Sequence, residues 1–400
     1  MRISPAVHWA SMALAVTSTT ALAQESSTQI YGTLNVDVER VEARGAVPPR
    51  NRVTQNSSNL GFRGEEKIGG GLAAIWQIES GVAVDAGGSS IASRNTAIGL
   101  KGGWGSLRLG QWDTPYKVIS GITDPMYFTG ITYTGALIGT PGFGVGPVTA
   151  GAPATSGDGR TFANIANASF ERRQGNSVQY WSPNIAGATL RFAYSANENR
   201  TAILNPQVFS GSLEYESGFF SLGYAHERHE DYFGADALVP AAQATPVTAS
   251  ASSRDDGDKL VARVKVGRTQ VGVMSERLRY ARSFAAAVPI ALSHYERDAY
   301  ALTLVQGIGA SGTIRALVGK ARDGKCSRFD GTACSTAGLG AHQLSLGYSH
   351  TLSKRTDLYA FYTKVDNDER ATYQFANGAG IGAPAGAASI GYVLGIRHVF

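Results

Sequence analysis

A period-two alternation of apolar and polar residues recurs along most of this chain and limits the folds that it can adopt. In residues 30–38, Ile, Leu and Val alternate with Thr, Asn and Asp, and residues 259–266 place Lys and Arg opposite Leu, Ala and Val. No stretch beyond the N-terminal region shows the i, i+3, i+4, i+7 spacing of an amphipathic helix. The alternation predicts β-strands with one apolar and one polar face.

Sixteen segments show this alternation completely or in part, and connections of two kinds separate them. The predicted strands are 28–44, 52–66, 71–84, 92–102, 104–113, 172–183, 187–200, 206–217, 218–230, 256–267, 269–283, 292–308, 311–323, 339–352, 354–367 and 387–400. Tight turns alternate with longer links rich in Gly, Ala, Pro and Thr, such as 231–255, 324–338 and 368–386. An even number of strands joined in this way is typical of an outer-membrane β-barrel.

A soluble β-sandwich or propeller is the competing interpretation of the same pattern. The polar face of the predicted strands carries repeated charges, and burying each of them in a dry core costs several kcal/mol. The cost disappears if the polar face lines water and the apolar face meets lipid. We therefore expect an all-β transmembrane barrel.

The N-terminus carries the pattern of an export signal. Arg2 provides a short positive region, residues 10–16 are apolar, and Ala21-Leu22-Ala23 forms an A-x-A cleavage site. The apolar part is too short to span a bilayer as a helix, and an ordinary first helix is the alternative. We expect residues 1–23 to be a signal peptide and residues 24–400 to form the mature barrel.

The last predicted strand ends on Phe400. Counting back in twos from Phe400 gives His398, Ile396, Leu394, Tyr392 and Ile390. A terminal Phe on an alternating apolar face resembles the signal by which the barrel assembly machinery receives outer-membrane barrels. A buried C-terminal strand without this role is the alternative.

Seven motifs follow one another along the mature chain: IYGTLNVD at 30–37, SNLGFRGEE at 58–66, IWQIE at 75–79, GSLRLGQ at 105–111, NSVQYWSP at 176–183, LSKRTDLYA at 352–360 and RHVF at 397–400. With these motifs in this order, the mature chain resembles the Gram-negative general porins, of the kind typical of β-proteobacteria. The resemblance implies a 16-stranded antiparallel β-barrel, a homotrimer, and a third loop folded inward to narrow the pore. It also implies an outer-membrane location, contact with membrane lipid and lipopolysaccharide, and passage of ions and small hydrophilic solutes.

The link at about 113–171 fits this third loop, and it contains Tyr116, Asp124 and Tyr127. A link that long without strands is usually functional or disordered. Because alternate residues of a strand face the same side, the polar positions predict which side chains face the lumen. The basic ones are Arg63, Arg108, Arg173, Arg191, Arg263, Lys265 and Arg315, and the acidic ones are Asp37, Glu39 and Glu79. Because basic side chains in a narrow pore concentrate anions, we expect weak anion preference.

By resemblance, Arg63, Arg94 and Arg173 form a basic cluster at the constriction and face Glu79, with Arg108 and Asp124 nearby. Strict alternation places Arg94 on the apolar face of its strand, so a bulge or a late strand start is required there. For any single arginine, a solvated position on the wall is the alternative.

Cys326 and Cys334 are the only cysteines and lie eight positions apart. Exported proteins meet oxidising conditions, so a local disulfide is expected, and two free thiols are the alternative. A metal site is disfavoured because the nearest histidine, His342, lies outside that loop.

Motifs for other functions are weak in this chain. Gly307–Gly312 matches G-x-G-x-x-G but opens no predicted helix, so it is interpreted as a turn. His226 and His229 face opposite sides of one strand, and no G-x-S-x-G is present. Scattered charges argue against nucleic-acid binding. We expect a general porin without enzymatic activity, cofactor or metal. A substrate-selective channel is the second hypothesis, and a barrel enzyme or adhesin is the third.

Overall fold

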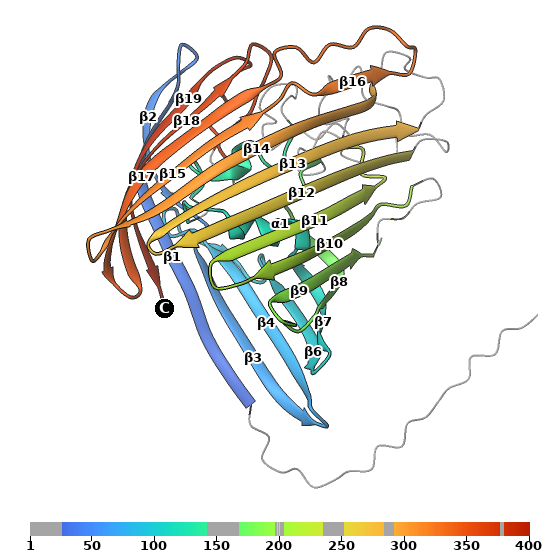
Figure 1. Ribbon diagram of the computed structural model, residues 1–400, viewed down its shortest axis with the longest axis vertical. Coiled ribbons are helices and arrows are strands. Elements are labelled where there is room, and N and C mark those ends of the chain that lie inside the picture. The colour runs from blue at the N-terminus through green and yellow to red at the C-terminus, as the bar shows by residue number, and fades with distance from the viewer. Residues whose placement is uncertain are drawn as a thin grey trace, which may run out of the picture.

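The computed structural model describes residues 26–127, 129–141, 168–196, 198, 200, 204–234, 252–283, 292–376 and 380–400. Residues 1–25 lie outside this part of the chain, so the signal peptide stays a prediction. The regular structure is almost entirely antiparallel strand (Figure 1). The strands are β1 (Ser26–Ala43), β2 (Val47–Gln55), β3 (Asn59–Gly69), β4 (Leu72–Val82), β5 (Ser89–Ser90), β6 (Thr96–Gly102), β7 (Gly105–Asp113), β8 (Arg173–Trp181), β9 (Ala188–Ser195), β10 (Gln207–Glu216), β11 (Phe220–Glu230), β12 (Ser252–Val266), β13 (Thr269–Ser283), β14 (Leu292–Ile308), β15 (Gly312–Ala321), β16 (Lys325–Arg328), β17 (Ala341–Ser353), β18 (Thr356–Asn367) and β19 (Ser389–Val399).

These segments form sixteen strands of a closed barrel. β2 and β3 both pair with β1, β5 and β6 both pair with β4, and β15 and β16 both pair with β14. Each of these three pairs is therefore one strand with a short interruption. The last strand, β19, returns to β1 with Asp37 opposite Gly395, which closes the sheet. The predicted 16-stranded antiparallel barrel is confirmed.

The two faces of the wall differ as the alternation predicted. Outward side chains are apolar and exposed in the isolated chain, as at Ile98 (64%) and Leu394 (67%). Directly paired residues share a face, and the register pairs Lys259 with Glu276 on the inside. The same register places Arg63, Arg108, Arg191, Arg263, Lys265 and Arg315 inside, together with Asp37, Glu39 and Glu79. An apolar outside and a charged inside suit a barrel in lipid.

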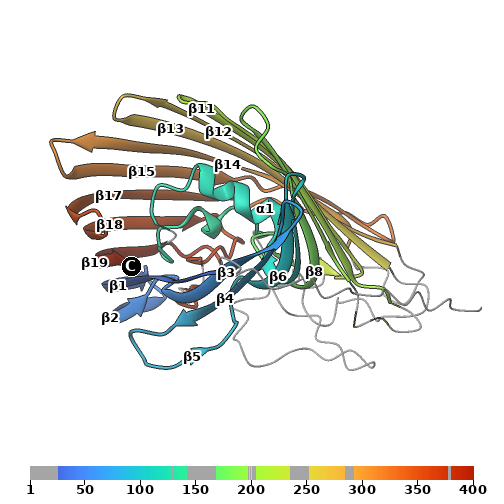
Figure 2. The same ribbon diagram turned by 90° about the horizontal axis from the view of Figure 1, so that it is seen from below.

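The short helices lie in the link after β7. α1 (Pro115–Val118) is followed by the 3₁₀ turns η1 (Ile119–Ile122) and η2 (Thr134–Ala136). The Thr114 side chain caps α1 by accepting a hydrogen bond from the Lys117 backbone N–H at 3.4 Å, and Pro115 occupies the first turn. α1 contacts β9, β10 and β11, while η1 contacts β11 and β12. Figure 2 shows α1 inside the ring of strands. No helix in the described ranges is long and apolar enough to span a bilayer.

The turn at one end of β12 is as tight as the sequence predicted. Gly267 and Arg268 alone separate β12 from β13, and Gly267 has φ +57°, in the left-handed region where glycine carries no steric penalty.

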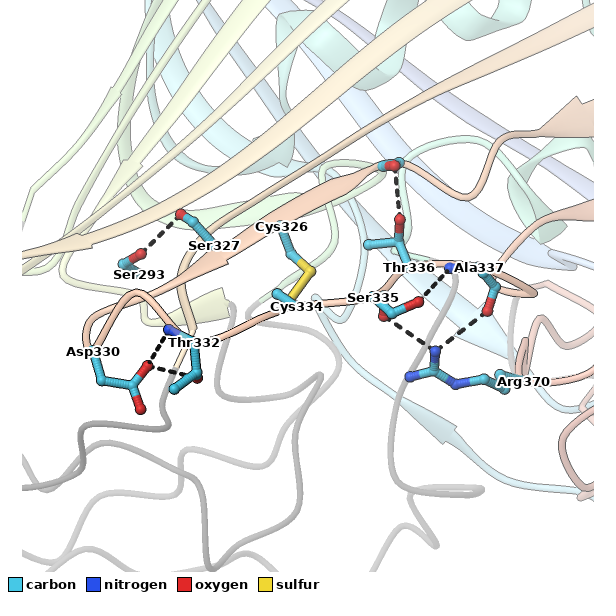
Figure 3. Close-up of a disulfide and its surroundings, with 11 residues drawn as sticks. Ser293, Cys326, Ser327, Asp330, Thr332, Cys334, Ser335, Thr336, Ala337 and Arg370 are labelled. Carbon is cyan, nitrogen blue, oxygen red and sulfur yellow. Dashed lines mark hydrogen bonds between the residues drawn. A yellow bond between two sulfur atoms is a disulfide. The ribbon is translucent and has the colours of Figure 1, made fainter.

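The predicted disulfide between Cys326 and Cys334 is confirmed, with a Cα–Cα distance of 5.8 Å (Figure 3). It closes a loop that begins in β16. Further bonds support the chain around it: Thr336 Oγ1 donates to the Gly324 carbonyl at 2.8 Å, and Arg370 Nη1 donates to the Ser335 carbonyl at 3.1 Å.

The C-terminal residue is paired with the first strand. Phe400 and Gly32 exchange two backbone hydrogen bonds of 3.1 Å, so the pairing of β19 with β1 extends to the last residue. A Cβ added to Gly32 would lie 2.5 Å from the Phe400 ring, so the ring packs directly on this glycine.

Candidate functional site

The site is a cavity of about 870 Å³ between the barrel wall and the link that follows β7. Wall residues from β1, β2 and β7 line it together with Val118, Gly130 and Tyr133 of the link. Its lining includes five basic side chains and three acidic ones: Arg52, Arg94, Lys117, Arg173 and Arg397 against Glu39, Asp85 and Asp113. A polar, positively biased space thus lies inside a barrel whose outer surface is apolar.

The link residues 114–141 are held to the wall by a buried polar cluster, which we call the anchor: Lys259, Glu276 and Arg297 with Glu171. The first three side chains have no exposed surface, and the fourth is 7% exposed. Lys259 Nζ contacts a Glu171 carboxylate oxygen and lies 3.7 Å from Glu276 Oε2. Arg297 Nη2 lies 3.3 Å from Glu276 Oε1. Two cations therefore compensate two buried carboxylates.

The anchor reaches the link through backbone and side-chain groups. Glu276 accepts hydrogen bonds from the Tyr116 hydroxyl at 2.8 Å and from the Gly139 backbone N–H at 2.7 Å. Arg297 donates to the Leu137 carbonyl at 2.8 Å, and Lys259 Nζ donates to Ser120 Oγ at 2.8 Å. Burial and the nearby Glu276 carboxylate raise the pKa of Tyr116 well above its usual value, so its hydroxyl remains a donor.

Other lumenal side chains hold the middle of the link, between the residues that bond to the anchor. Arg315 donates to the Pro125 carbonyl at 2.8 Å and to the Tyr127 hydroxyl at 2.6 Å. Asn56 accepts from the Gly130 N–H at 2.9 Å, and Gln343 donates to the Tyr133 carbonyl at 3.1 Å. The link therefore bonds to β15, β17 and the segment between β2 and β3 as well as to the anchor on β12, β13 and β14.

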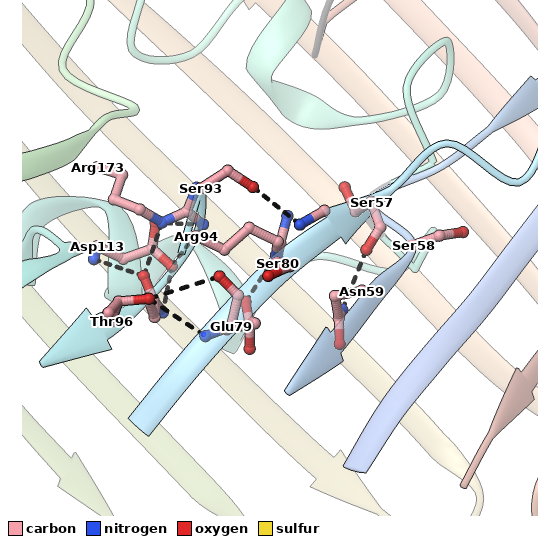
Figure 4. Close-up of polar contacts among 12 residues, drawn as sticks. Ser57, Ser58, Asn59, Glu79, Ser80, Ser93, Arg94, Thr96, Asp113 and Arg173 are labelled. Atoms are coloured by element: carbon pink, nitrogen blue, oxygen red, sulfur yellow. Dashed lines mark hydrogen bonds and ion pairs between the residues drawn. The ribbon is translucent and has the colours of Figure 1, made fainter. Parts of the chain in front are cut away.

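Arg94, Glu79 and Arg173 lie close together (Figure 4). Arg94 Nε is 2.6 Å from Glu79 Oε1, and the Tyr31 hydroxyl donates to the other oxygen of that carboxylate at 3.0 Å. β6 begins only at Thr96, so Arg94 precedes it. This late start is what strand parity required for Arg94 to face the lumen.

Arg173 forms the second part of this group. Its Nε donates to Asn95 Oδ1 at 2.7 Å, and its Nη2 lies 3.2 Å from Asp113 Oδ1. Lys117 Nζ approaches the same Asp113 oxygen at 2.9 Å. Asp113 is therefore shared by one wall cation, Arg173, and one link cation, Lys117, and this shared carboxylate couples the link to β8.

The remaining predicted site residues lie elsewhere. Arg63 is exposed, donates to Gln29 Oε1 at 2.9 Å, and lines a neighbouring cavity together with Arg108. Asp124 lies half-buried in the link and does not line the 870 Å³ cavity. The structure thus brings together Arg94, Arg173 and Glu79, and it places the other three apart from them.

Sequence reasoning missed three basic residues of the cavity. Arg52 pairs with Glu39 at 2.5 Å, Lys117 extends from α1, and Arg397 lies over the Tyr127 ring at 5.0 Å from its centroid. The hairpin of β1 and β2 was a usable signal for Arg52, because Glu39 had been assigned to the lumenal face and Arg52 stands opposite it.

A closed barrel with an apolar exterior, a charged interior and an internal cavity defines a membrane β-barrel channel. A family model of Gram-negative porins matches residues 10–370. The chain belongs to this family, and it is accordingly a β-barrel channel of the Gram-negative outer membrane.

Individual relatives agree with this assignment. The chain is 26% identical over 400 residues to outer membrane porin protein 32 of Delftia acidovorans, covering 97% of this chain and 98% of the relative. Its fold is similar to that of the anion-selective porin from Comamonas acidovorans, with a TM-score of 0.71, 23% identity, and coverage of 94% and 100%. The trimer form of OmpT from Vibrio cholerae gives a TM-score of 0.61 at 14% identity, with coverage of 94% and 99%.

Proposed function

We propose that the protein is a passive channel with a weak preference for anions, and that residues 114–141 are the inward-folded third loop that narrows it. The observation that carries this proposal is the 870 Å³ cavity between those residues and the wall, with five basic and three acidic lining side chains. In a narrow aqueous passage with low-dielectric walls, excess positive charge concentrates anions and repels cations.

The predicted constriction residues receive different roles in this proposal. Arg94 and Arg173 supply positive charge at the cavity, while Glu79 and Asp113 offset part of it. Arg63 and Arg108 act in the adjoining cavity along the same inner wall. Asp124 lies within the narrowing loop and lowers its positive charge. The anion selectivity of the Comamonas porin and the trimer form of OmpT support the same properties for this chain.

The assembly partners are also part of the proposal. A homotrimer in contact with lipopolysaccharide is expected, delivered by the barrel assembly machinery through the Phe400 signal. The role is transport, with no catalytic step assigned.

The proposal is tested with purified, refolded protein in planar bilayers. We expect discrete current steps that scale with KCl concentration, and liposomes that swell in small sugars more quickly than in large ones. Protein that migrates as a folded, heat-modifiable barrel but gives neither current steps nor swelling would refute the channel.

A further inference from the structure

A second feature of the inner wall is a cluster of indole and guanidinium groups at β7, β8 and β9. The Arg108 guanidinium carbon lies 5.1 Å from the Trp112 ring centroid and 4.3 Å from that of Trp181. The two indoles meet edge to face, with centroids 6.2 Å apart and planes at 86°. Arg108 therefore lies against both aromatic rings.

Strand parity did not indicate this arrangement, because the register of β7 changes. β7 and β8 shift register between Gly110 and Trp112. Gly110 has φ +146°, and a Cβ there would lie 2.4 Å from the Thr96 carbonyl oxygen, so the bulge requires glycine. The bulge sets Trp112 beside Arg108 and Trp181.

Arg108 lacks the polar partners of its neighbours. Within the described residues its side chain makes no hydrogen bond or ion pair, and its Nη1 is buried without an acceptor. Arg191, which also lies over Trp181 at 4.6 Å, is paired with Glu214. A guanidinium with five donors and no acceptor in an aromatic setting is suited to bind an anion.

Open space adjoins this cluster. A cavity of about 600 Å³ is lined by Arg108, Trp112 and Trp181 together with Arg63. The Lys101 ammonium, also in the lining, is matched by Glu65 at 2.9 Å. The volume falls within the range of small-molecule sites.

We propose that Arg108, Trp112 and Trp181 bind small aromatic carboxylates as they pass through the channel; this rests on the channel function proposed above. A carboxylate can accept two parallel hydrogen bonds from a guanidinium. An aromatic ring attached to it can pack on the indoles, which an inorganic anion cannot do. A neutral sugar could stack on the indoles and accept a hydrogen bond through a hydroxyl, but it would bring no negative charge to the Arg108 guanidinium.

The test measures how benzoate blocks the single-channel current. Acetate, which has the carboxylate but no ring, and benzyl alcohol, which has the ring but no charge, are the comparison probes. In wild-type channels, benzoate should reduce the open current at a concentration at least about tenfold below that of acetate or benzyl alcohol. Arg108→Gln should raise the half-blocking benzoate concentration about tenfold or more. Trp112→Leu should raise it while leaving acetate unchanged.

Lys265→Gln is the matched control, because it removes one lumenal charge from β12, away from the indoles, and it should keep wild-type block. Trp112→Phe, which retains an aromatic ring, replaces the leucine variant if that variant fails to fold, and its block should be intermediate. Three results would each overturn the site while leaving the channel intact. Benzoate could block no better than acetate, it could block no better than benzyl alcohol, or Arg108→Gln could keep the wild-type block by benzoate. Absence of any current in the wild type would instead refute the channel itself.

Discussion

Removing the buried cation at position 259 should release residues 114–141 from the wall. Lys259→Met keeps much of the side-chain volume but leaves the Glu171 and Glu276 carboxylates with one fewer counter-charge. It also removes the donor to Ser120 Oγ and the ammonium that lies 4.1 Å from the Tyr116 ring centroid. The anchor would then contain two carboxylates and only Arg297 as a cation.

The magnitude follows from burial. Breaking a buried ion pair by removing one partner costs about 3–5 kcal/mol, because the other charge stays buried and unpaired. At about 1.4 kcal/mol per factor of ten, the ratio of docked to undocked link falls by roughly a hundredfold to a few thousandfold. The barrel wall itself keeps its strand pairing, so we expect the cost to appear in the link rather than in the yield of folded barrel.

Single-channel recording measures this effect. Lys259→Met should give an open current with frequent transitions between levels, whereas wild-type current stays steady. Tyr116→Phe, which removes one 2.8 Å hydrogen bond to Glu276, should lie between them at a cost of about 1.5–3 kcal/mol. Lys265→Met is the matched control, since this exposed lysine lies on the same strand and the same face. Steady, wild-type current from folded Lys259→Met would refute the anchoring role.

Three further predictions concern the disulfide, the C-terminus and the link. Cys326 and Cys334 should resist thiol labelling of the folded protein until a reductant is added, and ready labelling of both without reduction would contradict the bridge. Phe400→Asp should lower the amount of heat-modifiable barrel in the outer membrane without blocking export, and an unchanged amount would count against its assembly role. Gly391→Val should alter open-channel conductance, because a Cβ at this position would lie 2.5 Å from Ile131 of the link. Conductance equal to wild type in bilayer recordings would show that the link tolerates the added bulk.

The strands could be predicted because lipid outside and water inside impose opposite demands on alternate residues. Each predicted segment therefore overlapped a real strand, including β14 at 292–308. The interruptions at 56–58, 91–95 and 322–324 were not predicted: the predicted strand 52–66 runs across the first, and β5 and β16 lie in segments that were interpreted as links. The interruption at 91–95 was the exception. Strict alternation placed Arg94 on the apolar face, and this conflict pointed to a bulge or to the late start of β6 that is observed.

The site was predicted less completely than the wall. Family resemblance assigned Arg94, Arg173 and Glu79, which do lie together, but it could not show that Arg63 faces a different cavity. The anchor was beyond sequence reasoning because Lys259 bonds to Ser120, far away along the chain. Alternation says that a lysine faces inward, but it does not say what packs against it.

The reversal potential across a KCl gradient reports directly whether the 870 Å³ cavity selects anions. The wild type should prefer chloride, and the double variant Arg94→Gln/Arg173→Gln should shift toward cation preference, because Glu79 and Asp113 lose their guanidinium partners. The shift should be large at low salt and small at 1 M, where the Debye length is only about 3 Å. Arg63→Gln removes one charge outside the 870 Å³ cavity and should shift the potential less. A double variant with the wild-type reversal potential at low salt would contradict the proposal that this cavity is the selective constriction.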